Sequence, residues 1–261
     1  MVRAAAFFDL DKTIIATSSA TAFSKGFLAE GLLTRRSVVA SAYAQLAYLL
    51  GSADAAATER LRAQLSRTVT GWDVATVSAV VRATLHESID PTVYAEAVEL
   101  IAEHQAAGRD VVVVSASGAE VVEPIAQMLG ADAVVATRMA VADGRYTGEI
   151  EFYAYGENKA TAIRELAAAR GYDLDASYAY SDSVTDAPML AVVGHGYAVN
   201  PDRALRRLAA EHGWGVLTFR RPVPLRALDR RAGATVAAVL GAVLVVTAVV
   251  VLLRRRPRPT R

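Results

Sequence analysis

Residues 4–15 have the sequence AAAFFDLDKTII, and this stretch decides how the chain is expected to fold. Ala4–Phe8 is a short apolar run, which is typical of a strand buried on both faces of a parallel sheet. The run stops at Asp9, and a second carboxylate, Asp11, follows two positions later. Because open parallel sheets bind their ligands at the carboxyl ends of the strands, this pair marks a candidate site.

Further apolar runs of strand length follow at wide intervals along the chain. We expect strands at Val111–Val114, Ser177–Tyr180, Tyr197–Val199 and Val216–Phe219. Helical patterns lie between them, at Pro91–Ala107, Ala119–Leu129 and Lys159–Arg170, and a glycine suited to end a helix follows each. This alternation predicts an α/β fold with a doubly wound, Rossmann-like parallel sheet. Asp143-Gly144 lies between two β-rich runs and predicts a hairpin within residues 138–155.

The interval between the first two strands, residues 14–87, is too long for a simple crossover. It shows no convincing strand, but it has helical patterns at Ser37–Leu50 and Ala55–Leu65. We therefore interpret residues 14–87 as a helical cap inserted into a core formed by residues 1–13 and 88–219. Pro222 and Pro224 mark a linker, which we assign to residues 220–231.

The C-terminal end of the 261-residue chain predicts a membrane anchor. Residues 232–253 contain no charged side chain, and about 20 apolar residues span a bilayer as a helix. Arginines flank this segment on both sides, and residues 254–261 form a basic tail. The net charge of +1 hides this division, because residues 1–202 carry 15 basic and 25 acidic side chains, whereas residues 203–261 carry 13 and 2.

The same features suggest where the chain resides. No secretory signal is recognisable at the first residues, so we expect a single-pass anchor in the cell membrane with the body of the chain in the cytoplasm. The flanking arginines are expected to meet lipid head groups, and we expect no nucleic-acid partner. The sequence carries no signal for an oligomeric state.

Polar side chains follow the later strands as they follow the first. Ser115 comes after the second strand in VVVVSASG, and Lys159 opens a helix in YGENKA. Asp182 and Asp186 follow the next strand in YSDSVTD. Each feature alone has a common structural explanation, such as a turn, a helix cap or a solvated lysine. Their occurrence together at strand ends predicts a catalytic site, and the absence of cysteine excludes a thiol nucleophile.

These segments resemble, in order, the four motifs of the haloacid dehalogenase superfamily of phosphotransferases. The motifs correspond to FFDLDKTII, SAS, Lys159 and SDSVTDAPML. The chain is similar to the subclass IB hydrolases, the phosphoserine phosphatase-like branch, over residues 4–219, and the insertion matches the branch's helical C1-type cap. The resemblance implies a Mg²⁺-dependent phosphomonoester hydrolase that works through an aspartyl-phosphate.

The resemblance also implies the roles of individual residues. Asp9 would be the nucleophile, and Asp11 would protonate the leaving oxygen and later deprotonate water. Lys159 would neutralise charge on the phosphoryl group and on Asp9. Thr13 would hold the loop and hydrogen-bond near the nucleophile. The phosphate would be bound by Thr13, Ser115, the backbone of Ala116 at a predicted helix N-terminus, and Lys159. Mg²⁺ would be held by Asp9, the carbonyl oxygen of Asp11, and Asp182, with support from Asp186.

Departures from the branch leave the substrate open. Phosphoserine phosphatases carry a Glu nine residues past the nucleophile, where it pairs with the substrate ammonium, but this chain has Ser18. Ser181 and Ser183 stand where many relatives have glycine. Arg60, Arg62 and Arg67 would either recognise a substrate anion or form a solvated helix face.

Two alternative functions remain at this stage. The second hypothesis is a membrane phosphatase acting on a lipid phosphate such as lysophosphatidate or phosphatidylglycerophosphate. The anchor adds weight to it, and the nearly uncharged residues 38–50 would either meet a lipid or form a helix that packs inside the cap. A non-catalytic regulatory protein is the third hypothesis, and the intact set of Asp9, Asp11, Lys159 and Asp182 argues against it.

Overall fold

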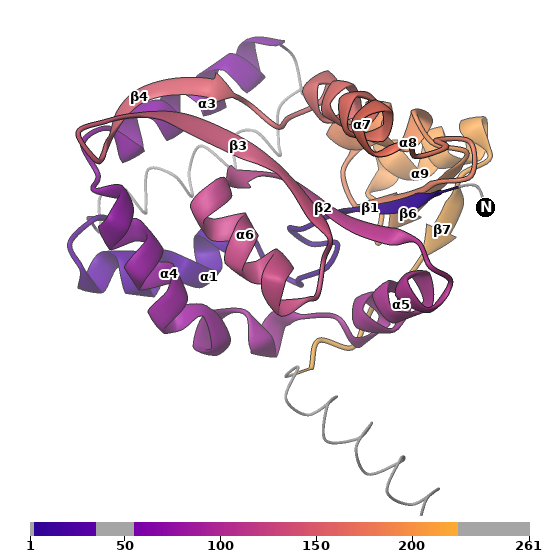
Figure 1. Cartoon of the computed structure of the whole chain (residues 1–261), viewed down its shortest axis with the longest axis horizontal. Helices are drawn as coiled ribbons and strands as arrows, with labels where there is room; N and C mark the ends of the chain where they lie inside the picture. Colours follow the sequence, from indigo (N-terminus) through magenta and orange to yellow (C-terminus); the bar gives the residue numbers. More distant parts are fainter. Residues whose placement is uncertain (1–2, 35–54, 224–261) are drawn as a thin grey trace, which may run out of the picture.

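The computed structural model describes residues 3–34 and 55–223, and its centre is a seven-stranded sheet (Figure 1). The strand order is β4-β3-β2-β1-β5-β6-β7. The strands are β1 (Ala5–Asp9), β2 (Asp110–Gly118), β3 (Ala133–Ala142), β4 (Arg145–Phe152), β5 (Tyr178–Ser181), β6 (His195–Val199) and β7 (Gly215–Leu217). Neighbouring strands are parallel except β3 and β4, which pair antiparallel at one edge. The predicted α/β parallel sheet is therefore confirmed, with the opening stretch at its centre.

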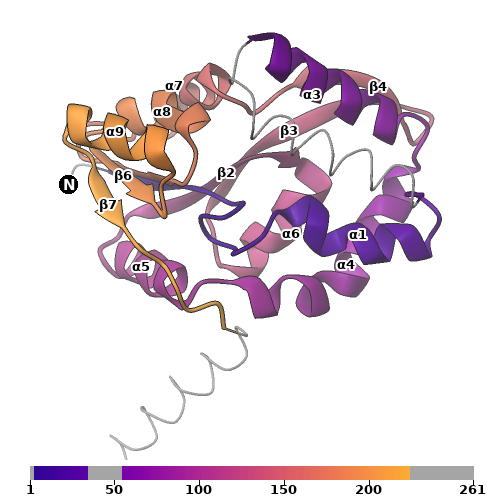
Figure 2. The ribbon, with the colours of Figure 1, turned by 180° about the vertical axis from the view of Figure 1, so that it is seen from behind.

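Helices cover both faces of this sheet (Figure 2). One face carries α5 (Ala95–Ala106) and α6 (Ala119–Met128), and the other carries α7 (Glu157–Arg170), α8 (Ala187–Ala191) and α9 (Arg203–His212). Successive side chains of a strand point to opposite faces, so β1 supplies both apolar layers. Phe8 packs in the layer under α5 and α6, and Phe7 packs in the layer under α7, α8 and α9. This arrangement confirms the doubly wound fold.

Between β1 and α5, the described residues form three α-helices: α1 (Ser19–Ala29), α3 (Ala55–Val69) and α4 (Val74–Ser88). We call them the inserted helices. The predicted helix at Ala55–Leu65 is confirmed as part of α3, whereas the one at Ser37–Leu50 lies outside the described residues. The boundaries that we assigned to a cap, residues 14–87, stay a prediction.

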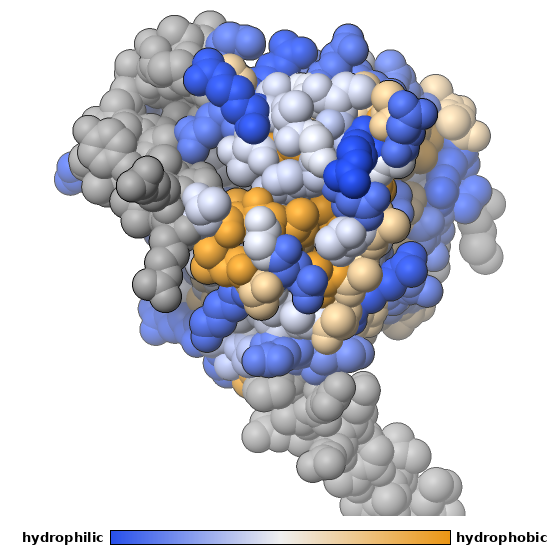
Figure 3. All heavy atoms as spheres, turned by 90° about the vertical axis from the view of Figure 1, so that its left-hand side faces the viewer, coloured by the Kyte–Doolittle hydropathy of each residue, from blue (hydrophilic) through white to orange (hydrophobic). Residues whose placement is uncertain are grey.

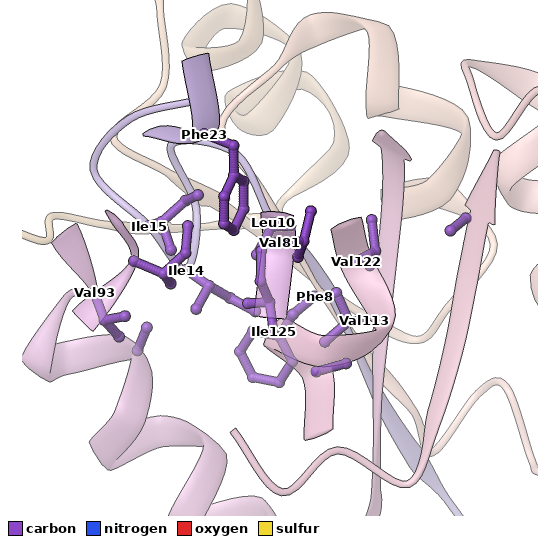
Figure 4. Packing of buried hydrophobic residues seen from close by; sticks show 14 of the residues in the cluster. Phe8, Leu10, Ile14, Ile15, Phe23, Val81, Val93, Val113, Val122 and Ile125 are labelled. Atoms are coloured by element: carbon purple, nitrogen blue, oxygen red, sulfur yellow. The ribbon is translucent and has the colours of Figure 1, made fainter. Parts of the chain in front are cut away.

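One apolar cluster joins the inserted helices to the sheet (Figure 4). Phe23 of α1 and Val81 of α4 lie in the same buried cluster as Phe8 and Leu10, and all four are fully buried. Burial of side chains of this size contributes about 1.5–3 kcal/mol each. This cluster therefore fixes α1 and α4 beside the carboxyl end of β1.

Several element boundaries differ from the prediction. Helix α5 begins at Ala95 rather than Pro91, because Asp90–Thr92 forms a separate 3-10 turn. Strand β2 continues to Gly118 because its end pairs with β3 through an irregular register. The first half of β3 was not predicted as a strand, although the hairpin that follows it was. That hairpin is confirmed, with Asp143 and Gly144 both at positive φ, 49° and 74°, as its two-residue turn requires.

The end of the described chain is tied to the segment that precedes α5. The N–H of Val223 donates to the carbonyl of Val93 at 2.9 Å, and Ala95 donates to Arg221 at 2.9 Å. The predicted membrane span, residues 232–253, lies outside the described residues. Among the residues that are described, no helix is long and apolar enough to cross a bilayer.

Hydrophobic residues also gather on one outer face, framed by hydrophilic side chains (Figure 3). This face lies on the side of the β3–β4 hairpin and the inserted helices (Figure 1). Partly buried residues of that region, including Leu65, Val69 and Trp72, pack against the apolar cluster. These apolar side chains of the inserted helices and the turn after α3 therefore extend the hydrophobic core to this face.

Candidate active site

A buried lysine joins two carboxylates at the carboxyl edge of the sheet. Nζ of Lys159 lies 2.7 Å from Oδ1 of Asp9 and 2.8 Å from Oδ2 of Asp186. The side chains of Lys159, Asp9 and Asp186 are only 3%, 9% and 4% exposed. Residues from the end of β1, the start of α7 and the segment after β5 thus meet at one point, as the sequence predicts.

The start of α7 aims Lys159 into the protein. Gly156 precedes the helix with φ 57° and ψ −128°, a backbone conformation that glycine adopts without strain. Asn158 donates its side-chain amide to the carbonyl of Tyr153 at 2.9 Å and closes this turn. Lys159 and Ile163 then share the buried face of α7, one helical turn apart.

The segment after β5 holds Asp186 through serine hydroxyls. Ser181 is fully buried and donates its hydroxyl to Oδ2 of Asp186 at 2.7 Å. The N–H of Ser183 donates back to Oγ of Ser181 at 3.2 Å. These serines, which we regarded from the sequence only as small replacements for glycine, therefore add hydrogen bonds that fix the carboxylate bound to Lys159.

The loop after β1 makes a tight turn that locks Asp9. Lys12 adopts a left-handed backbone with φ 61°, which is unusual for a residue with a side chain. Thr13 is fully buried, donates its hydroxyl to Oδ2 of Asp9 at 3.2 Å and accepts the N–H of Asp182 at 3.1 Å. Both hydrogen-bonding roles of this hydroxyl are used within the protein. Thr13 therefore holds the loop beside Asp9, as the resemblance implies, and ties it to the segment after β5; its predicted contact with a phosphate stays a prediction.

Asp11 lies beside the start of the inserted helices. The N–H of Ser19, the first residue of α1, donates to Oδ1 of Asp11 at 2.9 Å. The hydroxyl of Ser19 donates to Oδ2 of Asp11 at 3.3 Å and lies 2.8 Å from the hydroxyl of Ser117. Ser19 and Ser117 were not among the predicted site residues, because nothing in a serine's local sequence reports a partner 98 residues away.

The predicted phosphate-binding segment has a different backbone from the one expected. Ser115 is buried and lies within β2, so it does not stand at a helix N-terminus; α6 begins only at Ala119. The hydroxyl of Ser115 accepts the N–H of Ser117 at 3.2 Å, and the carbonyl of Ala116 accepts the hydroxyl of Thr137 at 2.7 Å. The irregular register between β2 and β3 creates this extended segment in place of the helix start.

The site carries more buried negative than positive charge. Burial raises the pKa of Asp9, Lys159 acts against this shift, and the carboxylates of Asp186 and Asp182 add to it. Burial raises the pKa of Asp182 to about 6, an effect that Lys12 opposes and Asp186 reinforces. Burial acts to lower the pKa of Lys159, but Asp186 and Asp9 outweigh it and raise the pKa, so the ammonium stays charged.

This donor set is suited in kind to a hard divalent cation. Its ligands are oxygen atoms, and burial disfavours the ionised forms of Asp9 and Asp182, as their raised pKa values indicate, so a cation beside them would stabilise the carboxylates. Within residues 3–34 and 55–223, however, no three histidine or carboxylate side chains are grouped closely enough to hold a metal ion by themselves. A cation would therefore need backbone and water ligands besides Asp9 and Asp182, as Mg²⁺ commonly does.

Comparisons with known proteins identify the family to which the chain belongs. The family model of haloacid dehalogenase-like hydrolases matches residues 6–191. A probable phosphatase of Mycobacterium tuberculosis is 58% identical over 97% of this chain and 90% of its own length. The inhibition of morphological differentiation protein of Streptomyces azureus is 61% identical over 86% of this chain and 81% of its own. A phosphoserine phosphatase of M. tuberculosis is 36% identical over 83% and 71%.

Solved structures share the fold. A protein of unknown function from Bordetella pertussis superimposes with a TM-score of 0.72 and 29% identity, covering 83% of this chain and 99% of its own. A phosphoserine phosphatase with an analogue of its phospho-aspartyl intermediate gives a TM-score of 0.59 over 88% of this chain and 99% of its own. At 20% identity the latter supports the fold alone. With the family match and the relatives above, the chain belongs to the haloacid dehalogenase-like hydrolase family.

Proposed function

We propose that the protein hydrolyses phosphomonoesters with Mg²⁺ through a phosphorylated Asp9. The observation that carries this proposal is the buried contact of Lys159 with both Asp9 and Asp186 at the carboxyl edge of the sheet. Burying an ion pair costs free energy unless further hydrogen bonds or charges compensate for the lost water. Buried charged groups with shifted pKa values are common at functional sites. Relatives named as phosphatases make phosphate esters the first substrate class to test.

In the first half of the reaction, a carboxylate oxygen of Asp9 attacks phosphorus and the bond to the leaving oxygen breaks. Thr13 and Lys159 each hold one oxygen of Asp9, so the carboxylate is oriented before substrate arrives. Asp11 gives its proton to the leaving oxygen, which departs as an alcohol. Burial raises the pKa of Asp11, although hydrogen bonds from Ser19 oppose the shift, and this favours an acid that can donate.

In the second half, water attacks the phosphorus of the aspartyl-phosphate. Asp11 now accepts the proton of that water, and the bond between Asp9 and phosphorus breaks to release inorganic phosphate. The same carboxyl group thus returns to its protonated state. Lys159 stabilises the charge on the phosphoryl oxygens in both halves. Asp186, which accepts the hydroxyl of Ser181, holds the ammonium in place.

Mg²⁺ would be held by Asp9, the carbonyl oxygen of Asp11, and Asp182, with Asp186 linked to the site through Lys159. When bound, it would neutralise the repulsion between the Asp9 carboxylate and the substrate phosphate. Ser115 and the backbone N–H of Ala116 are the groups that we assign to phosphate oxygens.

The substrate is proposed to be a phosphomonoester without a required ammonium group. Ser18 stands where a glutamate would pair with that ammonium, and its hydroxyl is already used: it accepts the N–H of Thr21 at 3.2 Å and caps α1. Arg62 of α3 lies near Glu59, with 3.7 Å between their charged atoms, and is 45% exposed. It therefore remains free to meet an anionic group of a substrate at modest cost.

A lipid phosphate is the second candidate, since residues 232–253 form an apolar stretch of membrane-spanning length. In this proposal the anchor holds the enzyme at the cell membrane with its catalytic part in the cytoplasm. The stretches that favour it, residues 38–50 and 232–253, lie outside the described residues.

The test is a substrate panel on the full chain in detergent with Mg²⁺. We expect hydrolysis of an aryl phosphate, loss of activity with a chelator, and recovery with added Mg²⁺. Phosphoserine, lysophosphatidate and phosphatidylglycerophosphate then separate the substrate classes. Strong preference for phosphoserine would contradict our interpretation of Ser18, and hydrolysis of none, aryl phosphate included, would favour a regulatory protein.

A further inference from the structure

Ser19 contacts both oxygens of the Asp11 carboxylate. Its N–H donates to Oδ1 at 2.9 Å, and its hydroxyl donates to Oδ2 at 3.3 Å. Ser19 is fully buried and is the first residue of α1, so the inserted helices hold it in place. A carboxyl group that is hydrogen-bonded at both oxygens has one defined orientation.

The hydroxyl of Ser117 extends this contact to the end of β2. Ser19 has a single hydroxyl proton, and it is given to Asp11, so in the 2.8 Å contact Ser117 donates and Ser19 accepts. The N–H of Ser117 in turn donates to Oγ of Ser115 at 3.2 Å. Ser117 therefore donates in two directions: its N–H donates to Ser115, in the segment that we assign to the phosphate, and its hydroxyl donates to Ser19, which donates to Asp11, the group that we assign as general acid.

The two contacts differ in what they allow. The backbone N–H can only donate, so Oδ1 is always an acceptor, whereas the hydroxyl of Ser19 can turn and accept from a protonated Oδ2. Ser117 can turn with it. Asp11 is therefore hydrogen-bonded with or without its proton, which suits a group that gives a proton in one half of a reaction and takes one in the other.

We propose that Ser19 is a positioning residue that orients Asp11 toward the leaving oxygen, with Ser117 in support. This inference rests on the proposed function. In the step concerned, the bond between phosphorus and the leaving oxygen breaks, and the proton on Oδ2 of Asp11 moves to that oxygen. A misoriented acid slows this step most when the leaving oxygen is basic, because an acidic leaving group departs without a proton.

The test compares phenyl phosphate, which has the more basic leaving group, with 4-nitrophenyl phosphate. We expect Ser19→Ala in the full chain to lower kcat about tenfold more for phenyl phosphate, with little change in KM. Ser117→Ala should shift the ratio in the same direction by a smaller factor, and it serves if Ser19→Ala does not fold. Ser18→Ala removes the cap of the same helix without touching Asp11 and should leave the ratio unchanged.

The outcomes distinguish a failure of the role proposed for Ser19 from a failure of the proposed phosphatase function. Asp11→Asn should show the same selective loss. The inference is wrong, while the proposed function stands, if Asp11→Asn slows phenyl phosphate selectively but neither Ser19→Ala nor Ser117→Ala does. It is also wrong if Ser18→Ala changes the ratio of the two rates as much as Ser19→Ala does. If Asp11→Asn retains wild-type rates on both esters, the assignment of Asp11 fails and the inference falls with it.

Discussion

The ammonium of Lys159 and the carboxylate of Asp9 form a hydrogen-bonded ion pair of 2.7 Å, although 150 residues separate them in the chain. The parallel sheet makes this contact possible, because β1 and the start of α7 both open at its carboxyl edge. Asp186 completes the group from a third segment. The pair belongs at once to the stability of the fold and to the proposed chemistry.

Replacing the lysine should therefore affect both properties. Lys159→Met leaves two buried carboxylates without their cation, and we expect the free energy of unfolding to fall by about 3–5 kcal/mol at neutral pH. Phosphatase activity should fall by about 10³-fold. Urea unfolding and steady-state kinetics measure the two effects. Lys25→Met, at an exposed position of α1, is the matched control and should change neither.

The hydroxyl of Thr13 gives a second prediction. Thr13→Val removes the bonds to Asp9 and to the N–H of Asp182 while keeping the side-chain volume. We expect a loss of about 1–3 kcal/mol in unfolding free energy and a roughly tenfold lower kcat, because Asp9 loses its orientation. Thr13→Ser retains the hydroxyl and should recover most of the activity. Equal activity of the Val and Ser variants would show that the hydroxyl positions nothing.

The hydroxyl of Ser181 gives a third prediction. Ser181→Gly removes the hydroxyl and with it the 2.7 Å hydrogen bond to Asp186. We expect about 1–2 kcal/mol lower stability and a several-fold lower kcat, measured as above. Ser177→Gly deletes a buried hydroxyl just before β5, at the other end of the strand from Ser181, and serves for comparison. It should lower stability without lowering kcat; a kcat loss matching that of Ser181→Gly would remove the assigned role.

The pH dependence of stability follows from His104, which lies under the sheet. Arg109 can only donate to Nδ1, at 2.6 Å, so neutral His104 carries its proton on Nε2 and donates it to Tyr180 at 2.8 Å. Burial lowers the pKa of His104 to about 4, and the charge of Arg109 adds to the shift. Between this value and the ordinary pKa of about 6.5, the unfolded chain binds a proton that the folded one does not.

Stability should therefore be complete above about pH 6.5 and decline as the pH falls toward 4. This one group should remove about 2 kcal/mol between pH 8 and pH 5. Unfolding curves of wild type and His104→Gln over this range measure it, and the variant should have the shallower dependence. His212→Gln, at an exposed position, should keep the wild-type slope. Parallel curves for wild type and His104→Gln would refute the assignment.

The sequence was informative where the local pattern of residues is enough to predict a strand, a turn or the end of a helix. The apolar run before Asp9, the glycines after the helices and the Asp143-Gly144 turn predicted β1, helix ends and a hairpin that the structure contains. The first half of β3 was missed because its apolar residues merge with the hairpin that follows. The start of α5 was placed too early because a 3-10 turn at Pro91 has the same local pattern as a helix.

The site could be predicted only in part for a related reason. Carboxylates and a lysine at strand ends and helix starts locate a charged site, since the topology brings those positions together. Which hydroxyls bind them depends on packing between distant segments. Ser19, Ser117 and Ser181 have ordinary local sequences, and their contacts to Asp11 and Asp186 exist only in the folded chain.

The central claim is that Asp9 becomes phosphorylated during turnover. The full chain would be mixed with Mg²⁺ and a substrate that it hydrolyses, quenched in acid within one turnover, reduced with borohydride, and digested for mass spectrometry. A carboxyl phosphate is reduced to an alcohol, so the account predicts homoserine at position 9 only when substrate is present. The account would be contradicted if Asp9 stays unmodified in a sample that turns over substrate and another residue carries the modification. Full activity of Asp9→Asn, with Asp9 unmodified in the wild type, would contradict it as well.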